Sequence, residues 1–597
     1  MEKELLLFLA TVDLGFSYLA FTNQQYFSPL LMILILLLPL LAAILFITPF
    51  TSAFGSSRKK KVVIIAAAVI SLILVCANLL FDHANPNVFN SAISAFALVF
   101  GAVIISTVAL YLIGRLMEKM EKRNRMRAYL FIAVALVVTA LAAYLFMYGF
   151  SRSSWSGVDE LAFNYYASYL FIHGVNPYTQ SMQPIISQRG IVPSLLVNGT
   201  YEYAYDYPAL SFLAYVPITA LGITNFFSFI FVLVFLSIVA AFAVYQSSGF
   251  SKKALLPAAA WLGLSYSLVS VSNTYLAVSV FLLFAYLYRK KSLLAGAFLG
   301  LAASTTQLAW FALPFFYVLT LKEDGLKKAA KRIAVSVLVF LAINSYFIAL
   351  SPRATLVNMF ALFGTSKLPF YGPNLMEYLL AYYPVPYAFS TIISVISLLF
   401  ALVVFYFYQR SAHYILAIVP MFIFFLSWRS ISIYSISYVP LLLALLYSDK
   451  EEKARGTLKN ANLIPIGIVA LVILFAVIAV LMHASYAKQD TLQINRIMPV
   501  VYTSQQYFSL GSIFVNVTNN GNANETVTFD IASRSPNQQA YVLGSTLSQL
   551  APGQSFNYQI NFQLPLVNNN TRLFVFAFSK DYTAHAQLNF SLNYSKA

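Results

Sequence analysis

Residues 462–483 read NLIPIGIVALVILFAVIAVLMH, an apolar stretch without a single Asp, Glu, Lys or Arg. A helix of about 20 such residues crosses the ~30 Å hydrocarbon core of a bilayer. Comparable stretches recur near residues 5–22, 28–50, 62–82, 88–114, 128–150, 225–246, 254–271, 273–288, 292–306, 308–321, 333–350, 386–408, 412–428 and 430–447. The sequence therefore predicts an all-α polytopic membrane bundle of about 15 transmembrane helices.

The composition supports the same class of protein. Of the 597 residues, 60% are hydrophobic and 10% are charged, whereas soluble domains carry about 25% charged residues. The net charge of +17 would suggest nucleic acid as a partner, but the basic residues lie in short loops between the predicted spans and instead report orientation. The single cysteine, Cys76, excludes an intrachain disulfide and a thiolate-based metal site.

The positive charge of the loops falls on one side of the predicted bundle. Lys and Arg cluster in segments 58–61, 115–127, 252–253, 289–291, 322–332 and 450–459 and at Arg410. Cytoplasmic loops are the ones enriched in Lys and Arg. A multi-pass cell-membrane protein is therefore predicted, with a cytoplasmic N-terminus and with the loop 151–206 and the C-terminal region outside. This count requires the apolar stretches 207–222 and 375–384 to lie on or dip into the outer interface without crossing.

The sequence changes character near residue 485. Short segments of alternating polarity, such as Ser512–Val517 and Thr526–Ile531, are separated by Asn- and Gly-rich turns, which is typical of a small β-sandwich. Three parts are thus predicted: four extra transmembrane helices in 1–127, a transmembrane core in 128–484, and an extracytoplasmic immunoglobulin-like β-sandwich in 485–597.

The loop 151–206 concentrates acidic side chains. Of the 20 acidic residues in the chain, this loop holds Asp159, Glu160, Glu202 and Asp206. A helix is predicted over about 157–173, since Ser156 suits its N-cap and Gly174 with Pro177 would end it. Long external loops are usually either functional or disordered.

The motifs of this loop resemble a known family. Asp159 follows a predicted span, then come an aromatic helix, Gly174-Val175-Asn176-Pro177-Tyr178, and Tyr205-Asp206-Tyr207-Pro208-Ala209-Leu210 at the start of an apolar stretch. This order resembles the GT-C superfamily of membrane glycosyltransferases, most closely the polyprenyl-phosphate-mannose-dependent type. Two departures are Ala209, where the family often has a second proline, and the four extra spans before the one that precedes the loop.

The resemblance implies transfer of a hexose, mannose in the closest type, from a polyprenyl-phosphate-sugar donor to a lipid-linked, glycan or surface-protein acceptor on the outer face. Phosphate is a good leaving group, so one carboxylate acting as base on the acceptor hydroxyl suffices for an inverting displacement. Asp159 is the expected base, although Ser156-x-x-Asp159 also fits a capping box. Glu160 is the second catalytic candidate, and its alternative is a solvated helix face.

Further residues are expected to bind substrate. Asp206 could contact acceptor hydroxyls or be a solvated loop acid, and the resemblance places the motif residues Tyr178 and Tyr207 at the substrate site. Arg429 or Arg353 would hold the donor phosphate, or else anchor a helix end among lipid headgroups. No His/Asp/Glu cluster has metal-like spacing. A divalent metal at Asp159 and Glu160 stays open, although no Asp-x-Asp pattern supports one, and no other cofactor is implied.

Two other function classes compete with the transferase. A polytopic transporter or flippase of lipid-linked sugars would carry ionisable groups inside its spans and weak internal symmetry. The predicted spans hold mainly Asp13, and no symmetry is visible. A surface-anchoring protein that acts through its C-terminal domain would need neither so many spans nor an acidic, aromatic loop.

Overall fold

The structure is a computed structural model. It describes residues 159–189, 191, 194, 202–222, 227–248, 254, 258, 261, 273–360, 375, 388–408, 413, 415–427, 434, 437–447, 463–487, 491–503, 508–535, 538–544, 549–566, 570–578 and 583–591. The predicted spans before residue 150, the proposed cap Ser156, the interfacial stretch 375–384 apart from Leu375 itself, and Arg429 lie outside these ranges.

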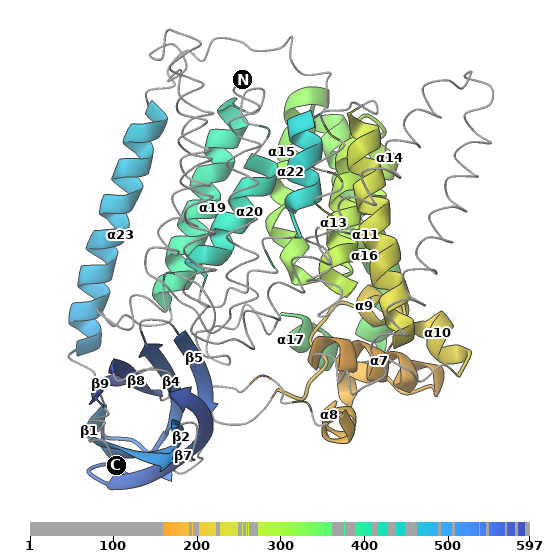
Figure 1. Cartoon of the computed structure of the whole chain (residues 1–597). Coiled ribbons are helices and arrows are strands. Elements are labelled where there is room, and N and C mark those ends of the chain that lie inside the picture. The colour runs from red at the N-terminus through yellow and green to blue at the C-terminus, as the bar shows by residue number, and fades with distance from the viewer. Residues whose placement is uncertain are drawn as a thin grey trace.

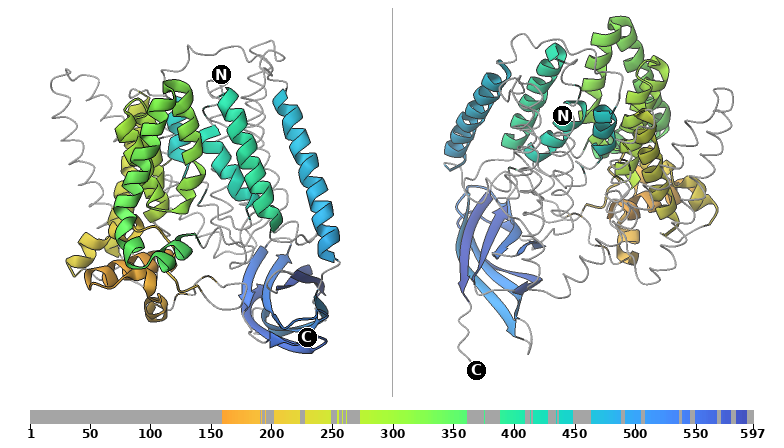
Figure 2. Two further views of the ribbon diagram at one scale, coloured as in Figure 1. Left: turned by 180° about the vertical axis from the view of Figure 1, so that it is seen from behind. Right: turned by 45° about the horizontal axis from the view of Figure 1, so that its top comes forward.

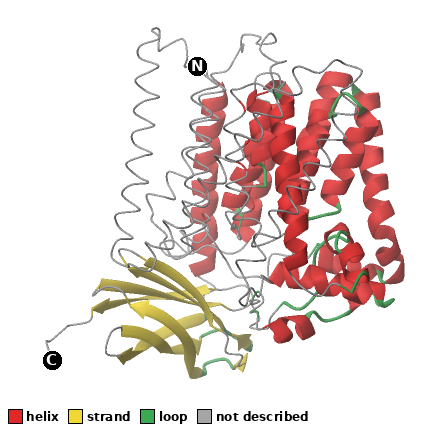
Figure 3. Ribbon diagram, turned by 45° about the vertical axis from the view of Figure 1, so that its right-hand side comes forward, coloured by secondary structure: helices red, strands yellow, loops and turns green. Residues whose placement is uncertain are grey.

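The described part of the chain is mostly helical, with antiparallel strands at its C-terminal end (Figure 1; Figure 3). Within the described residues, helices occupy apolar segments between residues 227 and 487. The helices are α7 (Asp159–Ile172), η2 (Pro177–Thr179), α8 (Gln183–Arg189), α9 (Leu210–Leu213), α10 (Val216–Ala220), α11 (Phe227–Ser247), α13 (Asn273–Leu287), α14 (Ser292–Ala303), η3 (Gln307–Phe311), α15 (Leu313–Asp324), α16 (Leu326–Leu350), α17 (Pro352–Met359), α19 (Ala388–Tyr408), α20 (Ile415–Leu426), α22 (Val439–Tyr447) and α23 (Leu463–Ala487).

Two of these helices meet the length and hydropathy of a membrane span within the described residues. They are Leu326–Leu350 and Ala388–Phe407, and five shorter apolar helices of 10–17 residues accompany them. Two such helices are weak evidence for a membrane protein, so the total of about 15 spans stays a prediction.

Helices α14 and α15 differ from the two crossings predicted over 292–306 and 308–321. Each has 12 residues and so rises about 18 Å, which is less than the ~30 Å hydrocarbon core. Non-helical backbone at Ser304–Thr306, followed by η3, joins them. Irregular backbone at such a position needs partners inside the protein, and the Trp310 indole N–H donates to the carbonyl of Ala303 at 2.9 Å.

Small residues let α14 lie directly against α16. A Cβ atom added at Gly296 would come within 2.8 Å of the Arg332 carbonyl oxygen, and one at Gly300 within 2.6 Å of the Ser336 carbonyl oxygen. The Ser336 hydroxyl also donates to the Gly296 carbonyl at 3.0 Å. The Gly-x-x-x-Gly spacing therefore brings the two backbones together, as it does in membrane helix pairs.

A layer of short helices covers one end of the bundle. This end layer consists of α7, η2, α8, α9, α10 and α17, and it lies at the same end as the strands in views from both sides (Figures 1 and 2). The stretch 207–222, predicted to lie on a membrane surface, forms the short helices α9 and α10 of four and five residues. The end layer has its own apolar core, in which Tyr178, Phe212 and Phe347 pack together.

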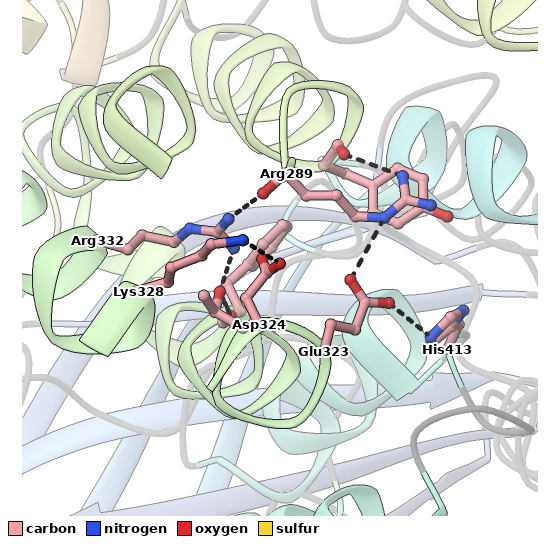
Figure 4. Close-up of polar contacts among 9 residues, drawn as sticks. Arg289, Glu323, Asp324, Lys328, Arg332 and His413 are labelled. Carbon is pink, nitrogen blue, oxygen red and sulfur yellow. Dashed lines mark hydrogen bonds and ion pairs between the residues drawn. The ribbon is translucent and has the colours of Figure 1, made fainter. Parts of the chain in front are cut away.

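The opposite end of the bundle carries a network of charged residues (Figure 4). Glu323, in the last turn of α15, lies 3.9 Å from the Arg289 guanidinium and 3.7 Å from His413. The Arg332 guanidinium, on α16, donates to the Arg289 carbonyl and to the Thr320 hydroxyl. These contacts join the connections that follow α13, α15 and α19.

The C-terminal strands form two main antiparallel sheets. One has the order β1-β2-β7 and the other β5-β4-β8-β9, with a two-stranded β3-β6 pair beside them. Side chains of both sheets meet where the Phe529 and Tyr558 rings lie 4.8 Å apart. The strands are β1 (Leu492–Thr503), β2 (Phe508–Asn519), β3 (Glu525–Thr526), β4 (Thr528–Ser535), β5 (Gln538–Gly544), β6 (Gln549–Leu550), β7 (Ser555–Leu566), β8 (Asn570–Phe578) and β9 (Thr583–Ser591).

Candidate functional site

The Gly-Val-Asn-Pro-Tyr motif ends helix α7 and starts η2. Gly174 has φ +75°, and the N–H groups of Gly174 and Val175 donate to the carbonyls of Phe171 and Leu170 at 3.0 and 2.9 Å. This pair of bonds is a Schellman motif, in which glycine adopts the left-handed conformation without steric cost. Asn176 then caps η2, because its side-chain oxygen accepts from the Tyr178 N–H at 3.1 Å. The motif thus serves first to turn the chain.

The tyrosines of the two motifs contact one another. The Tyr178 hydroxyl donates to the Tyr207 carbonyl at 2.7 Å, and the Tyr205 ring lies 5.3 Å from the Tyr178 ring and 6.0 Å from the Tyr207 ring. The Tyr205 hydroxyl donates to the Asn164 side chain of α7 at 2.7 Å. The motifs, separated by about 30 residues of sequence, form one unit with α7.

Polar side chains from the bundle hold the second motif in place. The Ala209 N–H donates to the Asn344 side chain of α16 at 2.9 Å, and the Leu210 N–H donates to the Ser304 carbonyl at 3.0 Å. The side-chain amide of Gln307 donates to the Asp206 carbonyl at 2.6 Å and to the Met359 carbonyl at 2.8 Å. The non-helical residues between α14 and α15, together with η3, therefore bind this motif and hold it in place.

Asp159 is the first residue of α7 in the described chain. Its Oδ1 accepts from the Glu160 N–H at 2.9 Å, and its Oδ2 accepts from the Ser194 hydroxyl at 3.3 Å. The Glu202 N–H in turn donates to the Ser194 carbonyl at 2.8 Å. The first bond joins neighbouring residues at the start of the described helix, whereas a capping side chain accepts from an N–H group two or three positions further on. The second bond ties the carboxylate to the far part of the loop. Neither bond decides between the capping and the catalytic interpretations of Asp159.

Glu160 lies inside the protein, and its interpretation as part of a solvated helix face was wrong. The residue is 3% exposed, and its Oε1 accepts from the Thr274 hydroxyl at the start of α13. The helical turn from Asp159 to Glu160 directs the second carboxylate toward the bundle and leaves the first beside the loop. Glu160 thus connects the end layer to α13.

Asp206 was expected to be either an acceptor contact or a solvated loop acid, and the structure shows that it is only partly exposed. Its Oδ1 is buried and has no hydrogen-bond partner among the described residues. Burial raises the pKa of this carboxyl group well above its ordinary value, and the nearby charges of Glu202 and Asp159 raise the pKa further. Gln307 of η3 fixes the backbone at this position by donating to the Asp206 carbonyl.

The structure brings five of the seven predicted site residues into one region. These are Asp159, Glu160, Tyr178, Asp206 and Tyr207, whose charges and rings act on one another. Arg353 is exposed in the first turn of α17, and no hydrogen bond or ion pair joins it to these acids within the described residues. Arg429 lies outside the described residues.

Sequence reasoning gave no functional role to four residues that support this site. Gln307 and Asn344 are polar residues in apolar segments, and such residues in a predicted span usually have a partner, so a signal existed for both. Thr274 and Ser194 carry no comparable signal, because hydroxyl residues occur throughout the chain. Among the described residues, no group of three or more His, Cys, Asp or Glu side chains has an arrangement that could hold a metal ion.

Comparison of the chain with protein-family models, with curated proteins and with solved structures finds no match.

Proposed function

We propose that this protein is a membrane glycosyltransferase of the cell envelope that moves a hexose from a polyprenyl-phosphate-sugar donor to a lipid-linked, glycan or surface-protein acceptor. The observation that carries the proposal is the meeting of Asp159, Glu160, Glu202 and Asp206 with the motif tyrosines in the end layer. The acids come from both ends of a loop, and the contacts described above hold those two ends together.

The chemistry needs one proton acceptor. The acceptor hydroxyl oxygen attacks the anomeric carbon of the donor, the bond from that carbon to the phosphate oxygen breaks, and the configuration inverts. The hydroxyl proton passes to Asp159, and the polyprenyl phosphate leaves as an anion, so no general acid is required. Asp159 suits this role better than Glu160, because Glu160 is buried and bonded to Thr274.

The donor phosphate requires a cation that the acid cluster does not supply. Arg353 is exposed on α17, and α17 is bound to the same Gln307 that holds Asp206. A guanidinium group suits phosphate oxygens because its planar fork donates two bonds at once. Arg429 or Arg353 is therefore the proposed phosphate ligand.

The test is transfer by the purified protein in lipid nanodiscs. A polyprenyl-phosphate hexose labelled in the sugar is supplied with lipid-linked glycan acceptors, and product is followed by its label and anomeric configuration. The proposal expects labelled product with inverted configuration. A flippase would instead move the labelled donor across proteoliposome membranes with no product, and that result would refute the transferase.

A further inference from the structure

The Asp206 carboxyl group is held in an unusual position for an acid. Its backbone carbonyl accepts from Gln307 at 2.6 Å, while its Oδ1 is buried without a hydrogen-bond partner among the described residues. The Asp206 backbone donates to this carboxyl group and lowers its pKa, but burial and the nearby acids raise the pKa more, because a buried charged oxygen without a partner is unfavourable. This arrangement favours the neutral form of the carboxyl group.

Among the residues that the structure describes, the charged groups that act on Asp206 are all acidic. From α7 come Asp159 and Glu160, and from its own loop comes Glu202. Three tyrosines that interact with it are neutral, namely Tyr178 of η2, Tyr205 and Tyr207. From η3 comes the neutral amide of Gln307, which donates to the Asp206 carbonyl. The neighbouring charges are therefore all of the same sign.

We propose that Asp206 works in its protonated form and donates a hydrogen bond through its carboxyl O–H to an oxygen atom of a sugar. This deepens the proposed function and rests on it. The buried, unpartnered oxygen and the like-charged neighbours both favour a neutral carboxyl group. The two acids then have different roles. Asp206 donates a hydrogen bond, whereas Asp159, which already accepts two hydrogen bonds, keeps its role as proton acceptor.

A sugar fits this position better than the donor phosphate does. Three other acids surround Asp206, and their negative charge repels a phosphate anion in a region that water enters poorly. A sugar hydroxyl or ring oxygen is neutral and accepts a hydrogen bond readily. The motif tyrosines already pack against one another, with Tyr178 and Tyr205 buried, so the sugar would meet the carboxyl group through a hydrogen bond and not by stacking on these two rings.

The test compares Asp206→Asn with Asp206→Ala in the nanodisc transfer assay across a pH series. The asparagine amide still donates, so Asp206→Asn is expected to keep most activity, with far less loss than the ~10²-fold that removing a general base causes. Asp206→Ala loses the donor, and about tenfold less transfer is expected for one hydrogen bond. The wild-type rate should fall as pH rises through the pKa of Asp206, and Asp206→Asn should lack that fall.

A measurement without substrate separates this inference from the proposed function. Difference infrared spectra of the purified wild type and Asp206→Asn should show a protonated-carboxyl carbonyl band that only the wild type has and that disappears at high pH. Absence of that band at neutral pH would overturn the inference even if transfer occurs. A loss of 10²-fold or more in folded Asp206→Asn would also overturn it, since Asp206 would then be a base. Wild-type activity in both variants would show that Asp206 makes no contact with the substrate and would overturn the inference.

Discussion

At the scale of single residues, the local sequence located the acids but not their surroundings. Asp159 could be identified as a candidate from its position in the order of motifs. The Asp206 carbonyl accepts from Gln307, which lies 101 positions away, and the partner of Glu160 is Thr274, 114 positions away. Such contacts are set by tertiary packing, so no local pattern in the loop could distinguish a buried acid from a solvated one.

Stability should respond to pH through Asp206. Its pKa is raised in the folded protein, so its contribution to stability is fully present below the unfolded pKa and is lost as pH rises through the folded pKa. Melting temperatures in detergent should therefore fall with rising pH above about 4 more steeply for the wild type than for Asp206→Asn. Parallel curves for the two proteins would contradict the raised pKa.

Glu160 is expected to be structural. Glu160→Gln keeps a side-chain oxygen that accepts from Thr274, so transfer and melting temperature should change little. Glu160→Leu leaves the buried Thr274 hydroxyl without this acceptor, and a loss of about 1–3 kcal/mol in unfolding free energy is expected. Thr274→Val is the matched control at the other end of the bond. A folded Glu160→Gln protein without transfer would show that Glu160 takes part in the chemistry.

At the scale of elements, the local stop signal was sufficient to place the end of α7, whereas local signals were insufficient for the hairpin of α14 and α15. The helix predicted over about 157–173 is found at Asp159–Ile172, because Gly174 ends it through local backbone bonds. Two apolar segments with a short interruption were taken as two spans. Their helical parts are shorter because Ser304–Thr306 leave the helix to bind the motif above them, which depends on residues far away in sequence.

Contact between α14 and α16 gives a prediction for this hairpin. Gly300→Ala places a Cβ atom 2.6 Å from the Ser336 carbonyl oxygen and 2.7 Å from the Val339 Cβ, so the helices must separate. Overpacking of this kind costs about 1–3 kcal/mol, to be measured as a lower melting temperature. Leu294→Ala, at a position 43% exposed on the same helix, is the control and should have little effect. An unchanged melting temperature for Gly300→Ala would refute the close contact.

At the scale of the whole molecule, the two ends of the bundle differ in chemistry. One end carries Arg289, Arg332 and their neighbours, while the other carries the acidic end layer and the strands (Figures 1 and 4). The sequence predicted strands near the C-terminus from alternation and turns, and strands lie there. The number of spans and the orientation in a membrane stay predictions, because they depend on lipid and on residues outside the described ranges.

Labelling from outside the cell tests that orientation. In a Cys76→Ser background, cysteines placed at the exposed positions Ser187 and Ser555 should react with an impermeant thiol reagent in intact cells. A cysteine at exposed Lys327 should react only after the membrane is opened, because basic loops face the cytoplasm. If both serine positions were protected from the reagent, the predicted orientation would be refuted. The acid cluster would then lie on the side of the membrane away from an external substrate.

The most direct measurement is hexose transfer by Asp159→Asn beside the wild type, in nanodiscs with labelled donor and with melting temperature as the check on folding. Asparagine still accepts a hydrogen bond from the Glu160 N–H or from Ser194, so a capping role survives the change while a proton acceptor is lost. The account predicts a folded variant whose transfer falls by about 10²–10⁴-fold, equivalent to roughly 3–5 kcal/mol in the barrier. A folded Asp159→Asn protein with near-normal transfer, or a wild type that transfers no hexose, would contradict it.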